Sequence, residues 1–256
     1  MKTLGIIPAR FASSRFPGKA LAVIAGKSMI QRVYERASAA RSLDELLVAT
    51  DDERIAECVE GFGGKVKMTS VSCASGTDRV ARVAADMQQY EIVVNIQGDE
   101  PLLEPENVDA AVNLIQKIPE ADITTLARPE SEQEDEAGDP NKVKVVLAEN
   151  GRALYFSRSP VPYLSDTGRR ALADSGSAIP ILIHIGLYVY RRAVLLQLCR
   201  LPQAELEVIE SLEQLRALNA GFSIFAARIE GNAPVGVDTP EDVARVECEL
   251  ERLGLE

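Results

Sequence analysis

Short apolar segments alternate with segments of helical pattern along the first half of the chain. Buried strands are predicted at residues 3–7, 46–50, 65–68, 92–96 and 123–127. Helices are predicted between them, at residues 28–41, 51–63, 79–89 and 105–117. Repeated strand–helix–strand units with short connections favour a parallel sheet that is covered by helices on both faces.

This alternation stops after residue 140. Strands are predicted at residues 142–147, 153–157, 181–190 and 222–229, and helices at 193–200, 206–220 and from Thr239 onward. The first three of these strands have no long helix between them, which indicates an antiparallel or mixed section. We therefore expect a single α/β domain, residues 1–256, whose sheet is mixed but mostly parallel, with a smaller lobe at about residues 130–200. The acidic stretch 130–139 is expected to be a solvated loop, and 165–177 a mobile loop.

Composition narrows the class of protein. The chain has 256 residues, 46% of them hydrophobic, and a net charge of −11, which disfavours binding to nucleic acid or to an anionic membrane through the general surface. Its four cysteines are scattered without a CxxC pair, and we find neither a signal peptide nor an apolar stretch long enough to span a bilayer. These features predict a cytoplasmic protein that does not insert into membranes.

A cationic loop follows the first predicted strand. It contains Arg10, Ser13, Arg15 and Lys19 and is interrupted by proline and glycine. In open α/β sheets ligands bind beyond the carboxyl ends of the strands, and guanidinium and ammonium groups bind phosphate oxygens. The loop therefore indicates a polyphosphate site, although it is neither a Walker loop nor a GxGxxG fingerprint. The alternative is a solvated surface loop whose charges aid solubility.

Two aspartates occupy corresponding positions later in the chain. Asp99 directly follows the strand at 92–96, and Asp238 immediately precedes the cap of the last helix. With a nucleotide present, both could bind Mg²⁺, which commonly takes few protein carboxylates together with substrate oxygens. On local grounds, a role in a turn remains the alternative for each of them.

Two further residues invite a functional interpretation. His184 is the only histidine and lies inside an apolar strand, where a structural role is the usual one. Arg158 ends a strand before a Ser-Pro pair and could be either a surface arginine or a clamp for a substrate carboxylate. With one histidine, the chain offers no histidine-rich zinc site and no compelling Ser-His-Asp triad.

Eight short motifs occur in a recognisable order. They are IPAR…PGK (7–19), ATD (49–51), SGTDR (75–79), NIQGDEP (95–101), ALYFSR (153–158), HIGLY (184–188), LEQLR (212–216) and GVDTP (236–240). Together they resemble the 3-deoxy-manno-octulosonate (Kdo) cytidylyltransferase family, also called CMP-Kdo synthetases. The resemblance extends from residue 4 to about residue 250, and only the stretch from about 166 to 177 gives no match.

The resemblance implies a fold and a reaction. It implies a Rossmann-like nucleotidyltransferase fold with a dimerisation lobe, and hence a homodimer. The implied reaction is transfer of CMP from CTP to the anomeric hydroxyl of Kdo with release of pyrophosphate, for lipopolysaccharide synthesis. A cytidylyltransferase for a related acid sugar (8-amino-Kdo or a sialic acid) and a non-catalytic nucleotide-sensing module are the alternatives.

The resemblance also implies residue roles. Nucleotide binding would fall to Arg10, Ser13, Arg15, Lys19, Ser75, Thr77, Arg79 and Gln97. Sugar binding would fall to Gln97, Arg158, His184, Tyr188, Glu213 and Gln214. Asp99 and Asp238 would hold Mg²⁺ and, with Arg15 and Lys19, form the catalytic set. Positioning and neutralisation of charge carry most of the catalysis in such transfers, so no protein nucleophile is required.

Overall fold

The computed structural model describes residues 1–12, 15–130, 136–175, 181–230 and 236–255. Its strands are β1 (Thr3–Ala9), β2 (Val23–Ile24), β3 (Lys27–Ser28), β4 (Glu45–Thr50), β5 (Val66–Met68), β6 (Ile92–Asn95), β7 (Ile123–Pro129), β8 (Lys144–Leu147), β9 (Ala153–Ser157), β10 (Leu182–Arg191) and β11 (Ile224–Arg228). Its helices are the short 3₁₀ turn η1 (Lys19–Leu21), α1 (Met29–Ser38), α2 (Glu53–Gly61), α3 (Gly76–Asp86), α4 (Pro105–Lys117), α5 (Asp166–Ser175), α6 (Arg192–Leu198), α7 (Glu205–Glu210), α8 (Gln214–Asn219) and α9 (Pro240–Leu253).

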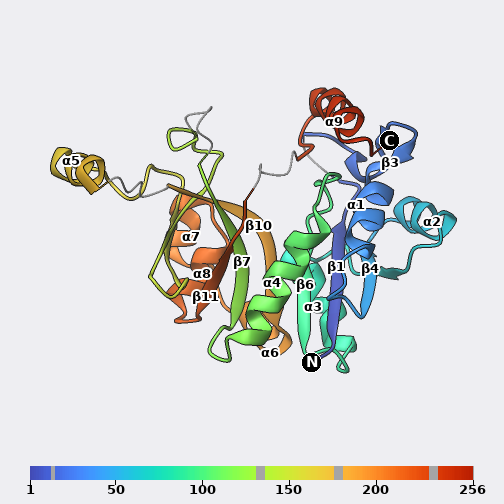
Figure 1. Ribbon diagram of the computed structural model, residues 1–256. Helices are drawn as coiled ribbons and strands as arrows, with labels where there is room; N and C mark the ends of the chain where they lie inside the picture. Colours follow the sequence, from blue (N-terminus) through green and yellow to red (C-terminus); the bar gives the residue numbers. More distant parts are fainter. Residues whose placement is uncertain (13–14, 131–135, 176–180, 231–235, 256) are drawn as a thin grey trace.

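A mixed sheet runs through the molecule (Figure 1). Its main strands lie in the order β11-β7-β10-β6-β1-β4-β5, and β8 and β9 extend it beyond β10. β1 pairs in parallel with β4 and β6, and β7 pairs in parallel with β11. β10 lies between β6 and β7 and is antiparallel to both. The predicted α/β class with a mostly parallel sheet is confirmed, and the predicted antiparallel section enters the middle of that sheet.

Side chains alternate between the two faces of the central strands, and each face has its own core. Ile7 and Val94 pack with α1, α2 and α4, whereas Ile6 and Val93 pack with α3, α6 and α8. Successive residues of a strand point to opposite faces, so the continuous apolar runs of the sequence produce two buried layers. This arrangement leaves the carboxyl ends of β1 and β6 open for ligands.

The last helix packs far from the strand that precedes it. β11 lies at one edge of the sheet, but α9 lies beside α1 and the β2–β3 hairpin (Figure 1). Val246 and Leu250 of α9 share a small apolar core with Ile24 and Met29. The Arg32 guanidinium donates a hydrogen bond to the carbonyl oxygen of Leu255 at 3.1 Å. This hydrogen bond fixes the residues that follow α9 next to α1.

Local capping explains several helix starts. Ser28 accepts a hydrogen bond from the backbone N–H of Gln31, as a helix N-cap does. Ser75 with Asp78, and Thr239 with Asp242, form capping boxes at the starts of α3 and α9. α4 begins at Pro105, where a missing N–H costs nothing. No helix within the described ranges is long and apolar enough to cross a membrane.

Three expectations about the second half of the chain were wrong. Residues Asp166–Ser175 form the helix α5, which projects beyond α7 and α8 in Figure 1, where we expected a mobile loop. The single helix expected at 206–220 is divided into α7 and α8 by Ser211, whose φ is +52°. The acidic stretch 130–139 is not entirely solvated, because Glu136 is 3% exposed and forms an ion pair with the buried Arg128.

Candidate functional site

The cationic loop folds back sharply onto the end of β1. Gly18 has a φ of +72°, in the left-handed region that favours glycine, and its N–H donates to the carbonyl oxygen of Phe11 at 2.9 Å. A Cβ at Gly18 would lie 3.0 Å from the Phe11 ring. The turn continues directly into η1, so the first residue of η1, Lys19, faces the carboxyl ends of the strands.

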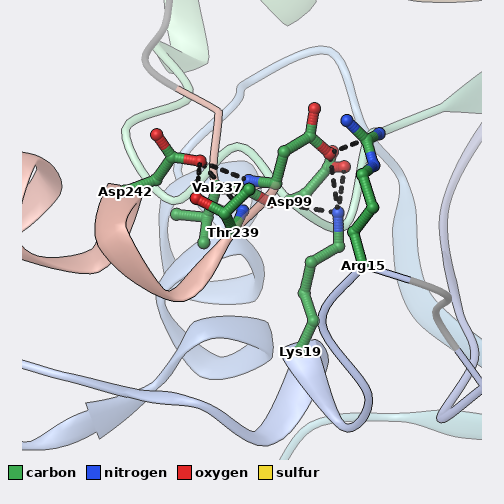
Figure 2. A network of polar contacts seen from close by, with 7 residues as sticks. Arg15, Lys19, Asp99, Val237, Thr239 and Asp242 are labelled. Atoms are coloured by element: carbon green, nitrogen blue, oxygen red, sulfur yellow. Dashed lines mark hydrogen bonds and ion pairs between the residues drawn. The ribbon is translucent and has the colours of Figure 1, made fainter.

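Lys19 and Arg15 meet the two predicted metal-binding aspartates (Figure 2). The Lys19 Nζ atom lies 2.7 Å from Asp99 Oδ2, 3.4 Å from Asp238 Oδ1 and 3.0 Å from the carbonyl oxygen of Val237. Arg15 Nη2 lies 3.1 Å from the same Asp238 oxygen. The structure therefore brings the four residues of the predicted catalytic set together, from segments up to 223 positions apart in sequence.

Backbone contacts fix the two aspartates relative to each other. The Val237 N–H donates to the carbonyl oxygen of Asp99 at 2.9 Å. Asp242 Oδ2 accepts hydrogen bonds from the backbone N–H groups of Asp238 and Thr239, at 3.0 and 2.9 Å. These bonds lower the pKa of the Asp242 carboxyl. A Cβ at Gly98 would lie 2.9 Å from the Pro8 carbonyl oxygen, so glycine allows the Asp99 loop to approach β1.

A cavity of about 450 Å³ surrounds this cluster. The predicted site residues that line it are Arg10, Arg15, Lys19, Ser75, Arg79, Gln97, Asp99 and Asp238. Ser13 lies outside the described residues. Cations and carboxylates at the carboxyl end of a parallel sheet can bind a polyphosphate with its counter-ion. The cavity therefore holds the side-chain types that the predicted phosphate site needs, and phosphate binding there stays a prediction.

Ser75 and Arg79 are also engaged in structural contacts. Ser75 caps α3, and its hydroxyl accepts a hydrogen bond from the N–H of Asp78 at 3.0 Å. The Arg79 side chain is 4% exposed, pairs with Asp51 at 2.8 Å and donates to the Thr69 hydroxyl. Their direct roles toward a nucleotide stay predictions, but both side chains shape the wall of the cavity.

A second cavity of about 230 Å³ adjoins the first. The two share Pro8, Gly76 and Gln97 in their walls. The predicted residues that line the second cavity are Thr77, Gln97, Tyr188, Glu213 and Gln214. The Gln97 amide donates to the Gly186 carbonyl oxygen at 3.0 Å, which holds this side chain at the boundary between the two cavities. Two ligands in adjoining cavities would meet beside Gln97.

The break between α7 and α8 places the polar residues of the second cavity. Ser211 ends α7 in the left-handed conformation, and Glu213 then caps the short helix α8 that begins with Gln214. Burial raises the pKa of Glu213, and burial also raises the pKa of Tyr188 well above its usual value. The Tyr188 phenol therefore stays protonated in this cavity and can form hydrogen bonds with a ligand.

His184 adjoins the second cavity through the ring of Tyr188, whose centroid is 5.4 Å from its own. The Thr125 hydroxyl lies 2.9 Å from His184 Nε2 and 2.8 Å from the Leu187 carbonyl oxygen. If the single Thr125 proton is donated to that carbonyl, His184 Nε2 carries the proton that Thr125 accepts. Nδ1 is then an acceptor, but His184 lines neither cavity, so its predicted role in sugar binding stays a prediction.

The environment of His184 makes it a poor acid or base. Burial lowers the pKa of His184 to about 3, so the imidazole stays neutral in the folded protein near pH 7. In the unfolded chain its pKa is about 6.5. Above about pH 6.5 the imidazole is neutral in both the folded and the unfolded protein. Between about pH 6.5 and 3 only the unfolded protein binds the proton, which lowers the stability of the folded protein.

This difference predicts a pH-dependent stability difference between the wild type and His184→Gln. From pH 6.5 down to about 3, the wild type is expected to lose up to about 1.4 kcal/mol per pH unit relative to the variant. Urea unfolding at a series of pH values measures the difference. A difference that stays constant between pH 7 and pH 4 would show that His184 gains its proton in the folded state.

Arg158, like His184, lines neither of the two cavities. Its guanidinium donates to the carbonyl oxygens of Glu210 at 2.7 Å and Pro140 at 2.9 Å. Its backbone N–H donates to the Glu210 carboxylate at 2.9 Å. Arg158 thus ties β9 to α7 in this conformation, and a role as a carboxylate clamp stays a prediction.

Residues absent from the predicted set also contribute to the site. Asp242 holds the backbone of Asp238, and its signal in the sequence was the capping pattern Thr-x-x-Asp. Asn95 and Tyr190 line the second cavity, but they lie in strands with an ordinary apolar pattern. Thr125 orients His184 from the neighbouring strand β7, a contact that depends on strand order and leaves no local signal.

The chain is similar in sequence and structure to a family of known proteins. The family model described as "Cytidylyltransferase" matches residues 4–226. The 3-deoxy-manno-octulosonate cytidylyltransferases of Syntrophotalea carbinolica and Myxococcus xanthus are each 49% identical over 253 residues, which is 99% of this chain and 100% and 98% of theirs. A solved CMP:2-keto-3-deoxy-manno-octonic acid synthetase complexed with CTP is 41% identical, with a TM-score of 0.90 over 99% of this chain and 100% of that one.

Proposed function

We propose that this chain, which belongs to the 3-deoxy-manno-octulosonate cytidylyltransferase family, transfers CMP from CTP to the anomeric hydroxyl of Kdo. The product CMP-Kdo would supply lipopolysaccharide synthesis. The observation that carries the proposal is the cluster of Arg15, Lys19, Asp99 and Asp238 in a cavity large enough for a nucleotide. Identity to curated relatives over nearly the whole chain supports the choice of sugar.

The reaction is a substitution at phosphorus. The anomeric oxygen forms a bond to the α-phosphorus, and the bond from that phosphorus to the bridging oxygen breaks, so pyrophosphate leaves with the electron pair. The attacking hydroxyl gives its proton to solvent water. Lys19 and Arg15 would bind the phosphates and neutralise the charge that develops on the leaving group. Gln97, between the two cavities, would lie beside the reacting atoms.

The acid sugar would occupy the second cavity. Glu213 and Gln214 offer polar groups there, and Tyr188 offers a phenol. The neutral His184 would accept a hydrogen bond from a sugar hydroxyl. The transfer needs no protein nucleophile. These residues would therefore act by orienting the anomeric hydroxyl toward the first cavity, because holding the hydroxyl close to the α-phosphorus contributes a large part of the rate.

Asp99 and Asp238 fit the requirements of Mg²⁺. The Lys19 Nζ atom lies within 3.4 Å of an oxygen of each carboxylate, so both carboxylates can contact one cation. Within the described ranges, no group of three or more histidine, cysteine or acidic side chains forms a metal site by itself. Mg²⁺ commonly takes one or two carboxylates, with phosphate oxygens and water as the other ligands. Bound there, the ion would supply charge neutralisation at the α-phosphate and acidify the attacking hydroxyl.

Pyrophosphate release tests the proposed function. CTP, UTP and ATP are each offered with Kdo, 8-amino-Kdo and N-acetylneuraminate in the presence of Mg²⁺. We expect turnover with CTP and Kdo alone. Turnover with CTP and a different acid sugar would retain the phosphate chemistry and overturn the sugar assignment. CTP binding without release for any pair would favour the nucleotide-sensing alternative.

The proposal extends to a cytoplasmic homodimer. Leu206, Val208 and Ile209 of α7 and Leu154 of β9 are exposed apolar side chains. The two elements adjoin, because Glu210 accepts a hydrogen bond from the Ser157 hydroxyl at 2.7 Å. Neighbouring exposed apolar side chains favour contact with another protein surface, which supports pairing with a second copy. Sedimentation equilibrium measures the mass in solution, which we expect to be that of two chains.

A further inference from the structure

Lys19 occupies the place between the two aspartates that a bound cation would take. Its ammonium has three N–H donors and three oxygen neighbours, on Asp99, Val237 and Asp238. The Lys19 side chain is 18% exposed. Within the described residues, these neighbours account for the whole donor capacity of the ammonium. Lys19 can therefore bind a phosphate only after it gives up one of these partners.

The charges of the cluster balance without any metal. Lys19 and Arg15 carry two positive charges, and Asp99 and Asp238 carry two negative charges. A free divalent cation entering here would have to displace an ammonium that is already paired with both carboxylates. Displacement would leave that ammonium without a partner in a partly buried position, at a cost in free energy.

A triphosphate changes this balance because it brings several negative charges. Phosphate oxygens are strong acceptors for the Lys19 ammonium and the Arg15 guanidinium. Once both cations turn to the phosphates, Asp99 and Asp238 lose their partners and can ligate the metal that accompanies the nucleotide. Arg15 can change partners by side-chain rotation alone, because 66% of its side chain is accessible.

We propose that Lys19 is a resident counter-ion that keeps the site closed to free Mg²⁺ until a nucleotide arrives. The inference rests on the proposed function, because it assigns the phosphates of that substrate as the group that draws Lys19 away. The enzyme then acquires its metal together with the nucleotide. Lys19 thereby has two successive roles, first as the partner of the carboxylates and then as the partner of the phosphates.

Two hydrogen bonds that position the aspartate backbones are made without Lys19, whose ammonium also contacts the Val237 carbonyl oxygen. The Val237 N–H bonds to the Asp99 carbonyl oxygen, and Asp242 bonds to the Asp238 N–H. Removal of the ammonium therefore leaves Asp99 without its cationic partner and Asp238 paired with Arg15 alone, so the cluster carries a net negative charge. This negative charge attracts a divalent cation, because opposite charges a few ångströms apart attract one another strongly in a partly buried site.

Binding of free Mn²⁺, as a probe for Mg²⁺, tests this role in the nucleotide-free protein by electron paramagnetic resonance. We expect Lys19→Met to bind Mn²⁺ about tenfold or more tightly than the wild type, and Lys19→Arg, which keeps the charge, to bind as weakly as the wild type. Lys67→Met is the matched control, because Lys67 forms a similar pair with Asp86 at 2.9 Å away from the site. The gain should vanish in Lys19→Met combined with Asp99→Asn.

Two results would overturn the role of Lys19. One is tight Mn²⁺ binding by the nucleotide-free wild type, and the other is no gain in Lys19→Met although its circular dichroism spectrum and melting temperature match the wild type. Neither result concerns the sugar or the release of pyrophosphate. Wild-type turnover of CTP with Kdo tests the proposed function separately, so the two ideas can fail independently.

Discussion

Asp99→Asn is expected to reduce Mg²⁺-dependent pyrophosphate release by a factor on the order of a thousand, because metal stabilisation of developing charge contributes several kcal/mol to such reactions. Asparagine has nearly the same shape as aspartate but supplies no negative charge for a cation. The backbone carbonyl of Asp99 keeps its hydrogen bond from Val237, so the loop should stay in place. Initial rates over a range of Mg²⁺ concentrations measure the loss.

Asp86→Asn is the control for this substitution. Asp86 also pairs with a lysine, but 48% of its side chain is exposed and it lies at the end of α3, away from the cavity. We expect its turnover to match the wild type. Full Mg²⁺-dependent turnover by a correctly folded Asp99→Asn protein would refute the assignment of Asp99 as a metal ligand.

Arg79→Met is expected to reduce the free energy of unfolding by about 3–5 kcal/mol, because it removes one partner of a buried ion pair and leaves the other charge uncompensated. The Arg79 side chain is 4% exposed and that of Asp51 is 16% exposed. The substitution also removes the hydrogen bond to the Thr69 hydroxyl. Urea unfolding of the nucleotide-free protein measures the change, so that any direct contact with nucleotide does not contribute.

An exposed ion pair supplies the comparison for Arg79. Arg252 pairs with Glu249 on the surface of α9, with 63% of its side chain accessible, and exposed pairs contribute little to stability because water screens their charges. Arg252→Met should therefore unfold nearly as the wild type does. Replacing both Arg79 and Asp51 with neutral residues should recover part of the loss. Equal stabilities for Arg79→Met and Arg252→Met would mean that the buried pair contributes nothing.

Features that depend on neighbours in the sequence were predictable. The bounds of α4 follow from Pro105 and an apolar face, and the predicted range agrees with the observed Pro105–Lys117. The position of Asp99 at the end of β6 placed it in the ligand crevice, because the carboxyl ends of parallel strands share one edge of the sheet. The cationic loop with Lys19 was placed at the same edge on these grounds, whereas Asp238 was assigned to the site only through the family resemblance; the structure brings the three residues together.

Features that depend on distant partners were not predictable in this way. β10 enters between β6 and β7 in the antiparallel sense, and no local pattern specifies that order. The division of α7 from α8 depends on Ser211 adopting a φ of +52°, which serine rarely does and which its sequence neighbours do not indicate. Glu136 has an ordinary acidic context, and its burial depends on the conformation that brings it back to Arg128 of β7, eight residues earlier.

The position of α9 has a consequence for the newly made chain. The sheet is complete when residue 228 has been synthesised, but Asp238 and the helix that anchors it come later. A ribosome-bound or C-terminally clipped chain can thus form its sheet while it lacks one of the two carboxylates. Such a chain would lack Asp238 and the helix that anchors it, so we expect activity only after synthesis has passed α9.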